Sequence, residues 1–272
     1  MNYIFKLEHY FSYASFLLYI QLNFFKILLM KKFLFTLFCV VICGCAHQFV
    51  MPNNYEYKPM QNYQYTLATW QKISNNTQPI HIYVEGDGHS FYANGRPAAD
   101  PTPHDSFVRD LVANDSFDNV VYIARPCQFI NDSNCDVSLW TNARFSKQVI
   151  DSVATTIKQI ANTRPVVLIG YSGGAMVTGL VIKQNPDIKI KKWITIAGVL
   201  NHHGWTEYFG DAKLDKSLDM ESLPNVPQIH YAGNKDNIVP IKLSQKWIPA
   251  DKLKIISGAT HNNFPNLEID FK

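Results

Sequence analysis

Short apolar runs alternate with amphipathic segments from about residue 65 to the end of the chain. Six runs have the length of a strand and are almost continuously apolar, as is typical of strands buried on both faces of a parallel sheet. They cover residues 79–84, 120–124, 165–169, 193–197, 228–232 and 253–256, and a weaker alternation over 65–73 predicts an edge strand or hairpin. Helices are predicted between strands, around 145–160 and 175–183. This order predicts an α/β fold with a mostly parallel, doubly wound sheet flanked by helices.

Charge is unevenly placed along the 272 residues, which carry 25 basic and 22 acidic side chains, a formal charge of +3. Four lysines and one acid lie in residues 1–45, so the rest of the chain holds 21 of each sign. That balance lacks the basic excess of a nucleic-acid-binding protein. The content of 47% apolar and 17% charged residues is typical of a globular protein. We expect one folded domain, a monomer.

A secretory signal is predicted at residues 30–45, where two lysines precede a short apolar run. The run ends in Ile42-Cys43-Gly44-Cys45, which resembles the lipobox of bacterial lipoproteins. The resemblance implies cleavage before Cys45 and lipids, palmitate among them, on that cysteine. With Ala46 next, it also implies sorting to the outer membrane.

Residues 1–29 do not fit in front of such a signal. We interpret them as an over-extended reading of the gene, whose true start is Met30; the alternative is one long N-terminal membrane anchor. Residues 46–63 are polar and aromatic with little periodicity, which predicts a tether. The folded domain is then expected over 64–272.

Two cysteines outside the leader, Cys127 and Cys135, are eight positions apart in a loop-like stretch. In an exported protein this pair is expected to form a disulfide; the alternative is two buried free thiols. No zinc-ligand spacing is present, since His202 and His203 are adjacent without matching ligands nearby in the sequence. We therefore expect neither a metal nor an organic cofactor.

The strand predicted at 165–169 runs into Gly170-Tyr171-Ser172-Gly173-Gly174 and then a helix. A G-x-S-x-G sequence between a strand and a helix indicates a nucleophile elbow, whose sharp turn exposes the serine hydroxyl at the end of the sheet. The positions two before and two after the serine must be small to fit that turn. A glycine-rich turn that caps a helix is the alternative. Tyr171 is a candidate for the cleft.

A nucleophilic serine needs a base, and the base needs an acid to orient it. Asp236 follows the strand predicted at 228–232, and His261 lies in the loop after the last strand. Each residue follows the carboxyl end of a strand, where doubly wound folds bind ligands. Their order along the chain is that of α/β-hydrolases, not of chymotrypsin-like or subtilisin-like enzymes. We expect Ser172, Asp236 and His261 to form a catalytic triad.

Other histidines and acids fit these roles less well. His230 lies inside a predicted strand and is expected in the core. His202 and His203 either line the pocket or lie on the surface, and the pattern favours the surface. Three acids spaced four residues apart are typical of the solvated face of a short helix: Asp211, Asp215 and Asp219.

The oxyanion of the reaction should be stabilised by two backbone amides. One is that of Gly173, and the other belongs to the loop after the first core strand, where we assign it to Asp87 or Gly88. Glu85 and Gly86 of the same loop are candidates for the cleft. An acidic side chain beside an oxyanion opposes catalysis, so the Asp87 carboxylate is expected to point away. A plain turn is the alternative interpretation of this loop.

Three segments accompany the elbow: Glu85-Gly86-Asp87-Gly88, Arg125-Pro126-Cys127-Gln128 and Trp140-Thr141-Asn142-Ala143-Arg144-Phe145. With them, residues 78–264 resemble an α/β-hydrolase of the secreted or lipid-anchored bacterial group. The resemblance implies the α/β-hydrolase fold, and only residues 199–226 leave room for a cap, a short one. Arg125 follows a strand and either binds a substrate carboxylate or phosphate or pairs with Glu85 or Asp87; the ion pair is favoured.

The chain is thus expected to be an exported serine hydrolase, anchored to the membrane through its lipid. A carboxylic ester of a small molecule or a lipid is the expected substrate, by analogy with the commonest use of the fold. A peptidase or another acyl hydrolase would use the same triad. The alternative from another class is a non-catalytic surface-binding lipoprotein with a degenerate hydrolase fold.

Overall fold

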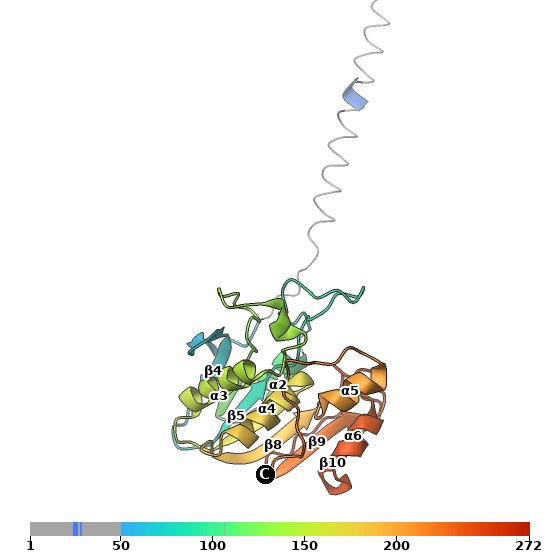
Figure 1. The fold of residues 1–272 in the computed structure, drawn as a ribbon. Coiled ribbons are helices and arrows are strands. Elements are labelled where there is room, and N and C mark those ends of the chain that lie inside the picture. The colour runs from blue at the N-terminus through green and yellow to red at the C-terminus, as the bar shows by residue number, and fades with distance from the viewer. Residues whose placement is uncertain (1–23, 27, 29–49, 106) are drawn as a thin grey trace, which may run out of the picture. The chain divides into compact units, whose positions relative to one another are not determined.

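The computed structural model describes residues 24–26, 28, 50–105 and 107–272 (Figure 1). The chain divides into two units, Met1–Gln48 and Phe49–Lys272. In the first unit the four described residues are helical, and the predicted start at Met30 and lipidation site at Cys45 lie outside the described residues. Across the described ranges, no helix combines the length and the apolar character that crossing a membrane requires.

An eight-stranded sheet forms the centre of the second unit, in the order β1-β4-β6-β5-β7-β8-β9-β10 (Figure 1). The strands from β6 to β10 in this order run parallel, and β4 pairs antiparallel with β6. The strands are β1 (Glu56–Tyr57), β4 (Thr69–Ile73), β5 (Ile80–Val84), β6 (Asn119–Ile123), β7 (Val166–Tyr171), β8 (Ile190–Ile196), β9 (Gln228–Gly233) and β10 (Leu253–Ile256). The predicted mostly parallel sheet is confirmed, with all six core strands in place.

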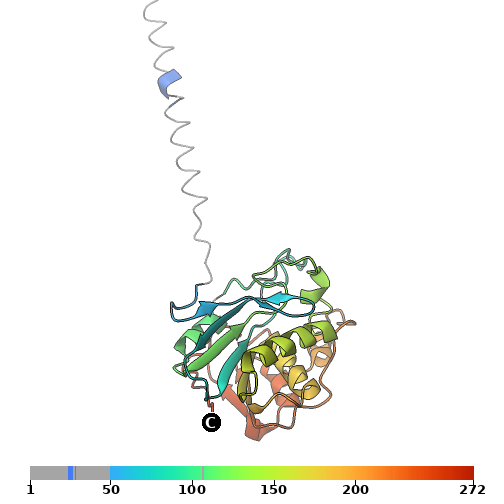
Figure 2. The same cartoon turned by 90° about the vertical axis from the view of Figure 1, so that its left-hand side faces the viewer.

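Helices cover both faces of this sheet, as the predicted fold class requires. In β5, Ile80, Ile82 and Val84 belong to one hydrophobic cluster, while Tyr83 belongs to another on the opposite face. Buried side chains of α3 and α4, the yellow-green and yellow helices in Figure 2, belong to the first cluster. Side chains of α2 and of the C-terminal residues belong to the second. The helices are α2 (Phe107–Asn114), α3 (Lys147–Ala161), α4 (Gly173–Gln184), α5 (His202–Phe209) and α6 (Ile241–Trp247), with short 3-10 turns at Val137–Trp140 and Ala250–Lys252.

The tether predicted over 46–63 is wrong for its described part, because residues 50–63 pack on the domain. Tyr55 is buried, and its hydroxyl donates to the carbonyl of Val112 at 2.8 Å. β1 pairs antiparallel with β4, and a second short ladder joins β2 (Met60–Gln61) to β3 (Thr66–Leu67). The first of these pairings ends the main sheet in a very short edge strand, which limits unwanted pairing there.

The strand ends bring the predicted site loops to one edge. The loop 85–88 follows β5, Ser172 follows β7, Asp236 follows β9 and His261 follows β10. β5 and β7 are neighbours, and so are β9 and β10. Because these strands are parallel, all four loops leave the sheet at its carboxyl edge.

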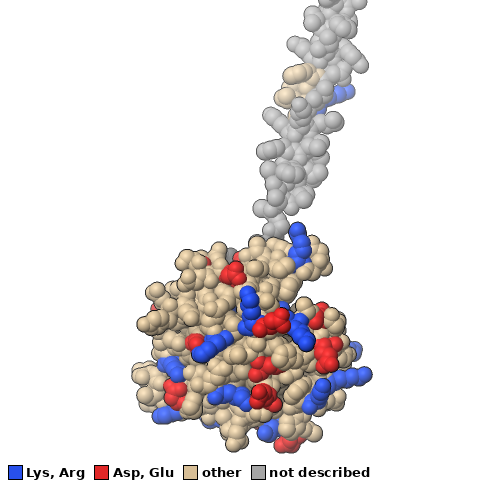
Figure 3. Space-filling model, viewed as in Figure 1, with Lys and Arg blue, Asp and Glu red and all other residues tan. Residues whose placement is uncertain are grey.

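Two other features bear on the sequence predictions. A disulfide joins Cys127 and Cys135, with the two Cα atoms 5.7 Å apart. On the face drawn in Figure 3, basic and acidic side chains are interspersed. Such a mixture gives no single-sign field on that face.

Candidate active site

Ser172 occupies the sharp turn between β7 and α4. Its backbone has a φ of 50° and a ψ of −121°, a left-handed conformation that strains a residue with a side chain. A Cβ atom at Gly170 would lie 2.5 Å from the carbonyl oxygen of Gly174, so the turn leaves no room for a side chain there. The nucleophile elbow predicted from G-x-S-x-G therefore has its expected geometry.

His261 and Asp236 form a hydrogen-bonded chain with Ser172. The Nε2 atom of His261 is 2.9 Å from the Ser172 Oγ atom, and its Nδ1 atom is 2.9 Å from Oδ2 of Asp236. Oδ1 of Asp236 accepts hydrogen bonds from the amides of Ile238 and Val239, both at 2.8 Å. The Asp236 side chain is fully buried, whereas that of His261 is 17% exposed. The acid is therefore fixed in place, and the imidazole is within reach of a substrate.

Tyr171 precedes the serine and contacts the histidine loop. Its hydroxyl donates to the carbonyl of His261 at 3.3 Å, and the two rings are 5.3 Å apart between centroids. The Phe107 ring packs on its other side at 5.0 Å. Tyr171, a cleft candidate from the sequence, thus supports the His261 backbone and also lines the cavity.

The loop after β5 packs directly against the serine. A Cβ atom at Gly86 would lie 3.1 Å from the Cβ of Ser172. The Gly86 amide donates to Oε1 of its neighbour Glu85 at 2.8 Å, whereas the amides of Asp87, Gly88 and Gly173 have no hydrogen-bond partner within the described residues. Unpartnered amides on both sides of a serine are what an oxyanion hole requires.

Glu85, at the start of this loop, is buried. The Tyr122 hydroxyl donates to its Oε2 at 2.7 Å. Burial raises the pKa of Glu85 to about 7, although the hydrogen bonds from Tyr122 and Gly86 oppose that rise. Glu85 therefore changes protonation near neutral pH while it holds the start of the oxyanion loop.

Asp87 forms an ion-pair cluster with two arginines. Its Oδ1 accepts from Nη1 of Arg125, and its Oδ2 accepts from Nη1 of Arg144 at 2.6 Å. Burial raises the pKa of Asp87, but the two guanidinium groups outweigh it and hold that pKa below its ordinary value. Of the alternatives for Arg125, the structure shows the ion pair, with Asp87 as the acid.

The Asp87 carboxylate does not point away from the reaction centre. It occupies the space in which a Cβ atom of Gly173 would lie, one residue from the nucleophile. The expectation that this side chain turns away was wrong because it counted only the negative charge. Two arginines neutralise that charge and hold it in place.

A cavity of about 380 Å³ opens beside Ser172 and His261. Its polar wall includes the predicted Glu85, Asp87 and Gly88, whereas Gly86 and Arg125 are not on it. The sequence missed several of its lining residues: Ser90, Phe91, Pro103, Asp105, Arg144, Phe145, Val199 and Ile238. Among the apolar residues expected in a cap, Trp205 and Leu214 line the cavity, whereas Tyr208 and Phe209 are exposed.

His202 lies on this cavity wall and is fully buried, contrary to the surface position that the sequence favoured. Within the part of the chain that the structure describes, neither of its ring nitrogens has a hydrogen-bond partner. Burial lowers its pKa, with His203 acting in the same direction and Asp219 opposing both. His230 is in the core as predicted, and burial lowers its pKa to about 3.

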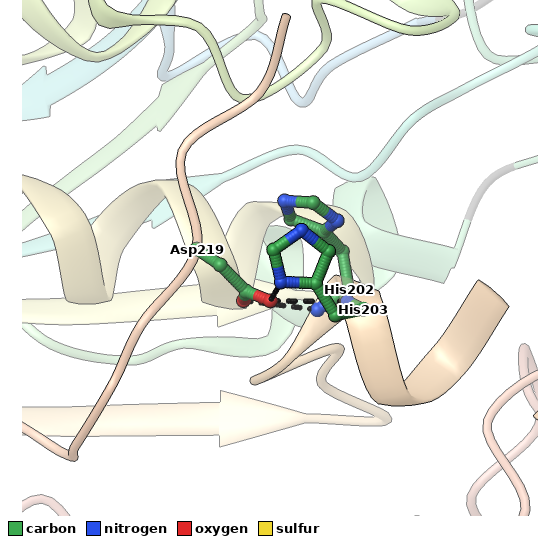
Figure 4. Close-up of side chains that lie close together, drawn as sticks. All are labelled: His202, His203 and Asp219. Atoms are coloured by element: carbon green, nitrogen blue, oxygen red, sulfur yellow. Dashed lines mark hydrogen bonds and ion pairs between the residues drawn. The ribbon is translucent and has the colours of Figure 1, made fainter. Parts of the chain in front are cut away.

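Figure 4 shows His202, His203 and Asp219 together at the start of α5. Their ligand atoms lie within 4.8 Å of one another, so the sequence missed Asp219 as a neighbour of the two histidines. The Asp219 carboxylate already accepts from the amides of His202 and His203, both at 3.0 Å, and from Nδ1 of His203 at 2.9 Å. Asp219 therefore binds amides in the first turn of α5, whose N-cap is Asn201, and is not part of a solvated helix face; its oxygens are occupied.

A model of a serine hydrolase family, FSH1, matches residues 122–255. No curated protein matches the chain in sequence. A lidless α/β serine hydrolase from Xanthomonas campestris is 14% identical, with a TM-score of 0.51 over 78% of this chain and 88% of that one. A putative lipase from Acinetobacter baumannii is 11% identical, with a TM-score of 0.52 over 77% and 85%. The α/β-hydrolase domain-containing protein 10 from mouse is 14% identical, with a TM-score of 0.51 over 76% and 90%. The fold is that of the α/β-hydrolases.

Proposed function

We propose that this chain, which has the α/β-hydrolase fold, is a serine hydrolase that cleaves carboxylic esters through an acyl-enzyme. The continuous contact from Ser172 through His261 to Asp236, with 2.9 Å at each step, is the observation that carries the proposal. The unpartnered amides on both sides of the serine support it.

Acylation begins when the Ser172 Oγ atom attacks the ester carbonyl carbon. The C=O π electrons move to the carbonyl oxygen, and the hydroxyl proton passes to Nε2 of His261. Asp236 accepts from Nδ1, so the imidazole presents its unprotonated Nε2 to the serine and is stabilised once it becomes cationic. The amides of Gly173 and of Asp87 or Gly88 donate to the new oxyanion.

Collapse of this intermediate restores the carbonyl and breaks the bond to the alcohol, which takes the proton from Nε2. Water then repeats the sequence on the acyl-enzyme: His261 removes its proton, the oxyanion forms again, and Ser172 leaves with the proton returned. The acid product and the free enzyme are formed, and every proton is accounted for by the one imidazole.

An ester is favoured over a peptide by the apolar, modest cavity and by the likeness in fold to a putative lipase. We further propose that the protein is exported and lipid-anchored at Cys45, a small-molecule or lipid ester being its substrate. The signal-like leader and the disulfide between Cys127 and Cys135 support export, because disulfides persist in oxidising compartments.

Fluorophosphonate labelling of the purified full-length chain tests the proposed activity. The wild type should be labelled, whereas Ser172→Ala and His261→Ala should not, and wild-type labelling should be followed by turnover of 4-nitrophenyl esters. Asp211→Asn, on the exposed part of the cap, is the matched control. Absence of labelling in a folded wild type would favour the non-catalytic binding lipoprotein instead.

A further inference from the structure

The cavity wall contains one guanidinium group whose hydrogen bonds are incompletely used. Arg144 donates from Nε to the carbonyl of Thr141 and from Nη1 to Asp87, both at 2.6 Å. Its Nη2 has no hydrogen-bond partner within the described residues, although the side chain is only 9% exposed and lines the cavity. Nη2 itself is not enclosed, so it can donate to water or to a ligand in the cavity.

The local charges leave an excess on the positive side. Arg125 and Arg144 share the single carboxylate of Asp87, so these three groups carry one net positive charge, which Glu85 balances only where it is ionised. The other ionisable groups on the wall are Glu85, Asp105, His202 and His261. Asp105 is exposed at the rim, where solvent screens it.

The cluster also lies close to the reacting atoms. Nη1 of Arg125 is 3.1 Å from the position of a Cβ on Gly173, and the Asp87 carboxylate packs against the same residue. On the far side, the Arg144 guanidinium lies 5.5 Å from the centroid of the Phe91 ring. Because Arg144 and Ser172 line the same cavity, a single substrate can reach both of them.

We propose that Arg144 binds a carboxylate carried by the substrate, so that the enzyme selects esters with a carboxylate on the acyl chain. The inference rests on the proposed esterase function. A carboxylate supplies the single negative charge that balances the cluster, whereas a dianionic phosphate exceeds it. One charge-assisted hydrogen bond corresponds to a preference of about 10- to 100-fold. Arg125, the arginine singled out in the sequence, then acts as a positioning residue that holds Asp87.

The test compares two chain-matched substrates, mono-4-nitrophenyl adipate and 4-nitrophenyl hexanoate, on the full-length protein. Wild type should show a kcat/KM at least about 10-fold higher for the adipate half-ester. In Arg144→Gln this ratio should fall to near one, and Arg144→Lys should restore part of it, because it restores the charge. Lys147→Gln removes an exposed lysine three positions along the chain and should keep the wild-type ratio.

If the wild type hydrolyses the hexanoate and the adipate half-ester with equal kcat/KM, the proposal is overturned, whether or not the variants fold. A ratio that survives in folded Arg144→Gln would do the same. Free adipate supplies a second readout, since it should slow fluorophosphonate labelling of the wild type but not of Arg144→Gln. If adipate does not slow labelling of the wild type, only the proposed role of Arg144 is rejected. If the wild type is not labelled at all, the esterase function is rejected and this inference with it.

Discussion

Two carboxylates flank the nucleophile, and their surroundings differ. Asp236 accepts from two backbone amides and from His261, and it belongs to a chain that ends on the serine. Asp87 is bound by two arginines and lies against Gly173. The first carboxylate orients a base that must exchange a proton, while the second neutralises charge beside the expected oxyanion. An imidazole beside Asp236 can accept and release a proton during the reaction. A guanidinium in its place could not, because it stays protonated.

The largest effect should come from Asp236→Asn. The amides of Ile238 and Val239 would continue to bind the carbonyl oxygen of the new side chain, which turns its NH₂ group toward Nδ1 of His261. Nδ1 must then accept a hydrogen bond, so the imidazole carries its proton on Nε2. In that tautomer Nε2 cannot take the hydroxyl proton of Ser172. We expect kcat to fall by about 10⁴-fold, measured with 4-nitrophenyl hexanoate.

Asp211→Asn makes the same chemical change on an exposed acid and should leave kcat unaltered. A folded Asp236→Asn protein with kcat within 10-fold of the wild type would show that the tautomer of His261 is not set by Asp236.

The second carboxylate is tested through stability, with Arg125→Met. This change leaves Asp87 with one of its two arginines and removes a donor to the carbonyl of Arg144. Breaking a buried ion pair from one side typically costs about 3–5 kcal/mol of unfolding free energy, which urea denaturation at pH 7 would measure. Lys147→Met breaks an exposed pair with Asp151 and should cost at most about 1 kcal/mol. Equal losses of unfolding free energy in Arg125→Met and Lys147→Met would show that the ion pair of Asp87 contributes no more to stability than an exposed pair.

The two carboxylates also differ in how far the sequence predicts them. Ser172, Asp236 and His261 each follow a strand, and strand ends converge in a parallel sheet, so their meeting could be predicted from strand order. The Asp87 cluster joins the loops after β5 and β6 to Arg144, which precedes α3. The sequence predicted that Arg125 pairs with Glu85 or Asp87, but no periodicity relates either loop to Arg144. The same holds for Asp219, whose contact with α5 depends on the path of an irregular segment. The prediction of a tether over 46–63 was wrong for a related reason, because two-residue strands are too short to show an alternating pattern in the sequence.

The smallest expected effect concerns Glu85, whose carboxylate accepts hydrogen bonds from the Tyr122 hydroxyl and the Gly86 amide. Because burial raises its pKa to about 7 from an ordinary 4.5, the folded protein binds a proton that the unfolded chain has released in this interval. Stability contributed by the protonated form is complete below pH 4.5 and is lost as pH rises through 7. The loss amounts to about 3 kcal/mol in total. Glu85→Gln cannot ionise; its amide oxygen can accept from the Gly86 amide while its NH₂ group donates to the Tyr122 oxygen. Its urea midpoint should therefore fall less than that of the wild type between pH 5 and pH 8.5. Parallel pH profiles for the two proteins would show instead that Glu85 is ionised throughout, with its charge balanced by the arginine pair that holds Asp87.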